Sequence, residues 1–126
     1  MLGTADLIAF VPTRDPEKAR RFYRDTLGLE LVGEDAFALV FNAHGVTLRI
    51  ANVSSVKGFR PARFTILGWQ VPSAERAVRE LRKKGVEFER FPGMGQDPSG
   101  IWTSPSGARV AWFKDPDGNI LSVTEV

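Results

Sequence analysis

The stretch DPDGNILSVTEV, residues 115–126, repeats the pattern of an earlier stretch, NAHGVTLRIANV, residues 42–53. Each begins with four residues that end in glycine, which is typical of a turn, and continues as a strand-like alternation of side chains. A second pair of segments, DTLGLEL (25–31) and RKKGVEF (82–88), matches in the same order. The two matched pairs indicate an internal repeat, and such a repeat determines the architecture of the chain.

Around these repeated segments, the residue pattern in each half of the chain predicts a strand, a helix and three further strands. Strands are predicted over residues 7–12, 29–33, 36–41, 45–53, 63–71 and 86–91, and over IWTS, ARVAWFK and NILSVTEV near the end. Asp15 and Ser73 are the predicted helix N-caps, and Gly28 and Gly85 the predicted helix ends. GMGQDPSG, residues 93–100, has the composition of a mobile loop, either a flap over a groove or an ordinary exposed loop.

The predicted fold class is α+β: two βαβββ modules pair into one curved mixed sheet, with both helices on its outer face. Module one covers about residues 1–53, residues 54–62 connect the modules, and module two covers residues 63–126. Together they form a single domain over residues 1–126, because one copy of the repeat is too small to bury a core alone.

The composition favours a globular protein without a membrane or nucleic-acid partner. No apolar run approaches the roughly 20 residues of a membrane helix, and the N-terminus lacks the features of a secretory signal, so we expect a cytoplasmic protein. The absence of cysteine excludes disulfides, thiolate metal sites and a cysteine nucleophile. The net charge is only +2. The basic residues concentrate in KARRFYR, GFRPAR and RAVRELRKK, and the helices predicted for two of these stretches also carry acidic residues, which indicates solvated helix faces.

Period-two alternation separates a helix-packing face from an opposite face on each strand. Leu48 and Ile50 mark the helix-packing face in one half, and Thr65, Leu67 and Trp69 are assigned to it in the other. The opposite face is predicted to carry Ile8, Phe10, Thr47, Arg49, Ile66, Gln70, Trp112, Ser122 and Thr124. Apolar walls with a few polar groups suit a ligand groove, and the alternative is a concave surface covered by a partner subunit or by water.

Three side chains leave alternatives open. Arg49 either binds an anionic group of a ligand or forms an ion pair with Asp35 or Glu125, and we favour the ion pair. His44, the only histidine, is a general base or a surface turn residue, and the turn is favoured because no orienting partner is evident. Trp102 precedes a turn and either borders the opening of the groove or packs in the core, which is the default for an aromatic side chain.

Three segments together resemble the vicinal oxygen chelate superfamily, which includes glyoxalase I, extradiol dioxygenases, and fosfomycin- and bleomycin-resistance proteins. They are VPTRDPEKARRFYRDTLGLELV, VPSAERAVRELRKKGVEF and VAWFKDPDGNILSV, and the resemblance covers essentially the whole chain. It implies the glyoxalase/bleomycin-resistance-like fold. Enzymes of this family bind a divalent metal through His, Glu or Gln from four strands, at the positions that are here Ile8, Arg49, Ile66 and Ser122. A shift of one residue at the two isoleucines gives no ligand either.

Two isoleucines, an arginine and a serine do not provide the converging imidazole and carboxylate donors of a divalent-metal site. The expectation is therefore no metal, no cofactor and no assigned catalytic residue. The resemblance then implies a metal-free small-molecule-binding protein, a homodimer whose ligand is partly apolar and, through Arg49, suited to carry a negative charge. The alternatives are a glyoxalase-like lyase or related metal-dependent enzyme with an atypical site, and a structural or regulatory domain without a small ligand.

Overall fold

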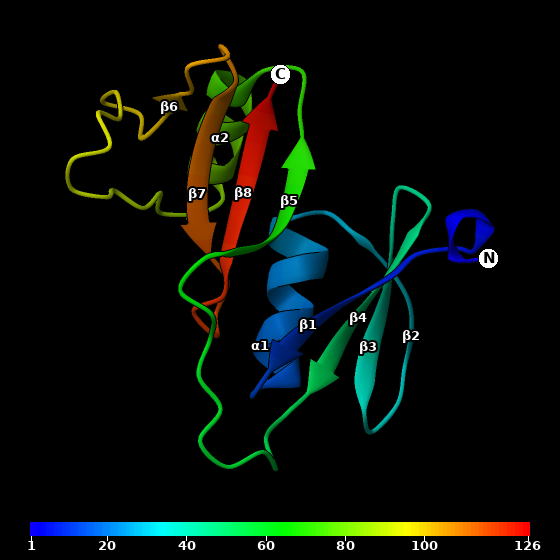
Figure 1. Cartoon of the computed structure of the whole chain (residues 1–126). Coiled ribbons are helices and arrows are strands. Elements are labelled where there is room, and N and C mark those ends of the chain that lie inside the picture. Colours follow the sequence, from blue (N-terminus) through cyan, green and yellow to red (C-terminus); the bar gives the residue numbers. More distant parts are fainter. The chain divides into compact units, whose positions relative to one another are not determined.

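A computed structural model describes all residues, 1–126. The chain divides into two compact units, a first unit Met1–Arg60 and a second unit Pro61–Val126, and the boundary falls inside the predicted connector. Each unit contains one four-stranded mixed sheet (Figure 1). This confirms the predicted α+β class with two repeated modules; that the two sheets join into one curved sheet stays a prediction.

The first unit forms its sheet in the strand order β1–β4–β3–β2, with β1 parallel to β4 and the other pairs antiparallel. Its elements are a 3-10 helix (Leu2–Thr4), β1 (Ile8–Thr13), α1 (Pro16–Arg20), a π-helical segment (Arg21–Thr26), β2 (Glu30–Glu34), β3 (Ala38–Ala43) and β4 (Val46–Asn52). Asp15 caps α1 as predicted, because its Oδ1 accepts the N–H of Lys18 at 3.2 Å. Gly28, at φ 76°, follows the helical segment.

One face of the first sheet packs against the helical segment. Leu48 and Ile50 of β4 are buried and stand opposite Phe41 and Leu39 of β3 in the antiparallel register. The ring of Tyr23, from the π-helical segment, lies 6.1 Å from that of Phe41 between centroids, and both rings are fully buried. The predicted helix-packing face of β4 is therefore correct, and its alternate residues lie on the other face.

The second unit repeats this arrangement in the order β5–β8–β7–β6, with β5 parallel to β8. Its elements are β5 (Thr65–Gln70), α2 (Ala74–Lys83), β6 (Trp102–Thr103), β7 (Arg109–Lys114) and β8 (Ile120–Glu125). Phe113 of β7 stands opposite Leu121 of β8, and both are buried together with Val78 of α2. No helix in either unit has the length and apolar character needed to cross a membrane.

The predicted strand over residues 86–91 is wrong. Phe88 forms only an isolated bridge with Phe113, and the N–H of Glu89 donates to the carbonyl of Trp112 at 2.8 Å. The chain then leaves β7, because the N–H of Phe91 donates to the side-chain oxygen of Gln96 at 2.7 Å and not to a strand. A side chain thus ends the ladder that the apolar pattern predicted.

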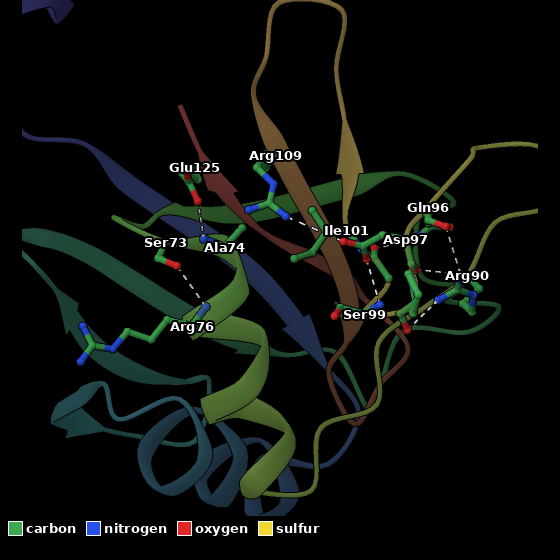
Figure 2. A network of polar contacts seen from close by, with 12 residues as sticks. Ser73, Ala74, Arg76, Arg90, Gln96, Asp97, Ser99, Ile101, Arg109 and Glu125 are labelled. Carbon is green, nitrogen blue, oxygen red and sulfur yellow. Dashed lines mark hydrogen bonds and ion pairs between the residues drawn. The ribbon is translucent and has the colours of Figure 1, made fainter.

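Helix α2 has two caps at its N-terminus, one local and one distant in sequence (Figure 2). The hydroxyl of Ser73 accepts the N–H of Arg76 at 3.1 Å, as predicted for an N-cap. The carboxylate of Glu125, at the end of β8, accepts the N–H of Ala74 at 2.8 Å. Ala74 is fully buried, so water cannot reach its N–H group. Glu125 supplies the hydrogen-bond acceptor in place of water.

Replacing Glu125 by alanine is expected to lower the free energy of unfolding by about 1–2 kcal/mol, since it leaves a buried N–H without an acceptor. Glu125→Gln keeps a side-chain oxygen at the same position and is the matched control. Urea denaturation of the two variants measures the difference. Equal stability of Glu125→Ala and the unmodified protein would show that the cap contributes nothing.

Candidate functional site

In the first unit, the face opposite the helical segment brings together the four predicted site residues of that unit. Ile8 pairs in register with Thr47, and Phe10 pairs with Arg49, so all four side chains lie on one face of β1 and β4. Ile8 is 50% exposed and Phe10 is 62% exposed. This face therefore presents two large apolar side chains beside one hydroxyl and one guanidinium.

Arg49 acts on Asp35 without a direct ion pair. The pKa of the Asp35 carboxyl is lowered, first by hydrogen bonds from the backbone N–H groups of Phe37 and Ala38 and then by the positive charge of Arg49. The other predicted partner, Glu125, has its carboxylate on the N-terminus of α2. Arg49 therefore has a long-range attraction for Asp35, and its guanidinium is not committed to either predicted carboxylate.

In the second unit, Ser122 of β8 stands between Gly68 of β5 and Trp112 of β7. Thr124 and Gln70 form the next pair on the same face. Only 7% of Ser122 is exposed, and its Oγ lies 2.6 Å from the place that a Cβ on residue 68 would occupy. Glycine at residue 68 therefore makes the room that the Ser122 hydroxyl fills.

The predicted alternation of β5 fails at its start. The register shifts between Thr65 and Leu67, so that Thr65 stands opposite Ile120 and Ile66 has no partner in the ladder. Thr65 therefore lies on the Ser122 face, and the prediction that it packs against the helix is wrong. An extra residue in a strand inverts the alternation, which strict period-two counting does not anticipate. Ile66 itself lies at this irregularity, and Leu67 keeps the predicted helix-packing side.

The indole of Trp112 covers β8, the strand between β5 and β7. Its Nε1 donates to the hydroxyl oxygen of Thr65 at 3.1 Å, although β8 lies between the strands that carry the two residues. The indole must therefore extend across β8, where Ile120 and Ser122 are both buried. The predicted groove residue Ser122 is on the predicted face, but it lies beneath an indole and not on an open surface.

Two further rings extend the indole into an aromatic cluster, which we define as Phe91, Trp102 and Trp112. The centroids of Phe91 and Trp112 are 5.5 Å apart with perpendicular planes, and those of Trp102 and Trp112 are 6.0 Å apart. All three side chains are partly exposed. Such a cluster offers ring faces and edges on which a flat apolar group can stack.

The loop over residues 93–100 was predicted from its composition to be mobile, but its backbone is held by one glutamine side chain. The amide of Gln96 accepts the N–H of Phe91 and donates from Nε2 to the carbonyls of Glu89 and Gly100, at 3.0 and 2.8 Å. Gln96 therefore joins the two ends of the loop.

Arg90 and Asp97 complete the network (Figure 2). The guanidinium of Arg90 donates to the carbonyls of residues 96, 97 and 98, at 3.2, 2.9 and 3.4 Å. Asp97 Oδ1 accepts the N–H groups of Ser99 and Ile101, both at 2.9 Å. The loop thus leads directly into β6, and it fixes the strand that carries Trp102.

The family-typical metal positions do not fit a divalent cation. Ile8 and Arg49 lie on one face of the first unit, and Ser122 and Ile66 belong to β8 and β5 of the second. None of the four carries an imidazole or a carboxylate, and no group of three or more His, Cys, Asp or Glu side chains that could hold a metal ion occurs in the structure. His44 is exposed at φ 51° in the β3–β4 turn, as favoured from the sequence.

One family model and one curated protein match most of the chain. The family model described as Glyoxalase/Bleomycin resistance protein/Dioxygenase superfamily matches residues 5–123. The chain is 28% identical over 122 residues to the uncharacterized protein YraH of Bacillus subtilis (strain 168), covering 86% of this chain and 88% of that protein.

Two solved structures are similar over nearly the whole chain. A member of the glyoxalase/bleomycin resistance protein/dioxygenase superfamily from Sphaerobacter thermophilus is similar with a TM-score of 0.77 and 25% identity, over 100% of both chains. A lactoylglutathione lyase from Agrobacterium tumefaciens is similar with a TM-score of 0.74 and 18% identity, over 97% of this chain and 93% of that one. The second likeness shows a shared fold alone.

Proposed function

Because the chain belongs to the Glyoxalase/Bleomycin resistance protein/Dioxygenase superfamily, we propose that it is a small-molecule-binding protein whose site works without a catalytic metal. The observation that carries this proposal is the side-chain chemistry at Ile8, Arg49, Ile66 and Ser122. Three of these side chains are neutral and poor metal ligands, and the fourth is a cation that would repel a metal ion. Of these positions, Ile8 and Arg49 lie on an exposed face of the first unit and suit contacts with an organic molecule.

Both faces described above offer groups for such a ligand. In the first unit, exposed Ile8 and Phe10 provide apolar surface, and Arg49 provides a positive charge for a carboxylate or phosphate. In the second unit, the aromatic cluster provides stacking surface, and Gln70 and Thr124 provide polar groups. A partly apolar ligand with an anionic group fits this chemistry. A homodimer in the cytoplasm is part of the same proposal.

Metal analysis and a ligand screen test the proposal together. Protein purified from medium supplemented with Zn, Ni, Mn and Fe is expected to contain well under one metal ion per chain. A thermal-shift screen with partly apolar organic anions is expected to find stabilising compounds, since a ligand at 100 times its Kd stabilises a protein by about 2.7 kcal/mol. A stoichiometric metal with lyase activity would favour the glyoxalase-like alternative, and a screen without any stabilising compound would favour a structural role.

Replacing Arg49 by leucine is expected to weaken the binding of an anionic compound from that screen about tenfold or more, because a charge-assisted hydrogen bond is lost. The binding of neutral compounds should stay within about twofold, which is a small free-energy difference. Isothermal titration of both classes measures the effect. Arg21→Leu removes an exposed cation from the same unit and is the matched control. An equal loss for anionic and neutral compounds would reject the anion-binding role of Arg49.

A further inference from the structure

A hollow lies on α2, away from the strand faces described above. It has a volume of about 410 Å³ and is lined by Glu75, Val78, Arg79, Arg82, Lys83 and Ser99. The five helical residues recur at intervals of three and four, so they occupy one face of α2. The sixth belongs to the loop that Gln96 holds in place. The volume is within the range of small-molecule sites, roughly 300–1,000 Å³.

Arg82 is held in position at this hollow before any ligand arrives. Its Nη2 donates to the carbonyl oxygen of Ser99 at 2.9 Å. Its guanidinium carbon lies 5.8 Å from the centre of the Phe88 ring, a cation–π arrangement. One of the five guanidinium N–H groups thus anchors the side chain, and others remain for a ligand. A positioned guanidinium loses less conformational entropy on binding than a free one.

The charges around the hollow are unbalanced. Three cations, Arg79, Arg82 and Lys83, face one carboxylate, Glu75, which leaves a local excess of two positive charges. The neighbouring Arg76, by contrast, is within 4.0 Å of a carboxylate of Glu80. The C-terminal end of a helix tolerates cations because of its dipole, but like charges this close still repel one another. An anion in the hollow would relieve that repulsion.

We propose that this hollow binds a tetrahedral oxyanion of the phosphate type, either inorganic phosphate or the phosphoryl group of a small molecule. The guanidinium of Arg82 donates paired N–H groups to two of its oxygens, which is the geometry that arginine favours with phosphate. Arg79 and Lys83 neutralise its charge, and the buried side chain of Val78 forms the apolar floor. This site is independent of the ligand proposed for the strand faces.

Titration with inorganic phosphate, followed by ¹⁵N NMR at constant ionic strength maintained with potassium chloride, tests the proposal. Saturable shifts are expected at the amides of Ser99 and Gly100 and at the Nε–H of Arg82. The variant Arg79→Gln/Lys83→Gln should bind phosphate at least about tenfold more weakly, through the loss of two charges. Arg63→Gln/Arg76→Gln removes the same charge from residues that do not line the hollow, and it should leave the affinity within about twofold.

Several results would overturn the proposal, and one further probe identifies the kind of phosphate that binds. Shifts that do not saturate, or an equal loss in the two double variants, would overturn it. Acetate that produces the same shifts at the same affinity would overturn the preference for a tetrahedral dianion. Phenyl phosphate distinguishes the sources: tighter binding than inorganic phosphate indicates a phosphorylated small molecule, and equal or weaker binding indicates the free ion. Arg82→Gln, with its fold checked by circular dichroism, should abolish the shift at Ser99.

Discussion

The variant Gln96→Ala is expected to unfold with a free energy about 3 kcal/mol lower than that of the unmodified protein, at about 1 kcal/mol for each lost hydrogen bond. The side chain of Gln96 makes hydrogen bonds with the backbone at Phe91, Glu89 and Gly100, all of them partly buried. Alanine leaves these three polar groups without partners. Urea denaturation followed by tryptophan fluorescence measures the loss.

Gln96→Glu separates hydrogen bonding from side-chain volume. A glutamate keeps an acceptor for the N–H of Phe91 but places an oxygen against the carbonyls of Glu89 and Gly100. This variant should therefore be at least as unstable as Gln96→Ala. Gln70→Ala, at an exposed position of β5, is the control and should change stability by less than about 0.5 kcal/mol. If Gln96→Ala were as stable as the control, the loop would not depend on Gln96.

The variant Trp112→Ala is expected to lose about 3 kcal/mol, at the lower end of the range for removing a large aromatic ring because the indole is partly exposed. The substitution removes ring contacts with Phe91 and Trp102 and the hydrogen bond to Thr65. It also uncovers Ser122, and so it should raise the exchange rate of the Ser122 backbone N–H. Urea denaturation and hydrogen exchange measure the two effects.

Two milder substitutions divide this loss into its parts. Trp112→Phe keeps an aromatic ring between Phe91 and Trp102 but removes the five-membered ring of the indole with its N–H, and Thr65→Val removes the matching acceptor. Thr65→Val should cost about 1 kcal/mol in the Trp112 background and close to nothing in the Trp112→Phe background, because Trp112→Phe has already broken the same hydrogen bond. Fully additive losses would contradict the contact between Trp112 and Thr65.

The repeat was enough to predict two similar modules, each with a helix and several strands. The alternation in β4 assigned Leu48 and Ile50 to the buried face, and the structure confirms both as buried. The helix caps at Asp15 and Ser73 were also readable, because a capping side chain acts on a backbone group within three residues. The predictions that were confirmed thus rest on helix caps within three residues of their partners and on the regular alternation of a strand.

The wrong predictions of secondary structure have local physical causes that no sequence pattern reveals. The strand predicted over residues 86–91 is ended by Gln96, and the loop after it is held by Arg90 and Asp97 through contacts with backbone groups. Such side-chain-to-backbone bonds leave no periodic signal in the sequence. The irregularity at Ile66 likewise inserts one residue that no composition reveals. Each error arose where a single side chain or a single extra residue overrides the pattern.

The candidate site likewise has features that the sequence predicts and features that it does not. The residue types at Ile8, Arg49, Ile66 and Ser122 could be read directly, and they decide against a divalent metal on chemical grounds. The indole of Trp112 across β8 could not be read, because it depends on a hydrogen bond between residues 47 positions apart. Facing directions in β1, β4 and β8 were thus predictable from the sequence, whereas the direction of Thr65 in β5 and the covering of Ser122 by the indole were not.

The cap that Glu125 places on Ala74 has a consequence for the order of folding. The two residues are 51 positions apart, so the start of α2 cannot obtain this acceptor until residue 125 has left the ribosome and β8 has paired. Contacts of such long sequence separation form late and slow the folding of a domain. A nascent chain stalled before residue 125 should therefore carry α2 with a frayed first turn, held by Ser73 alone.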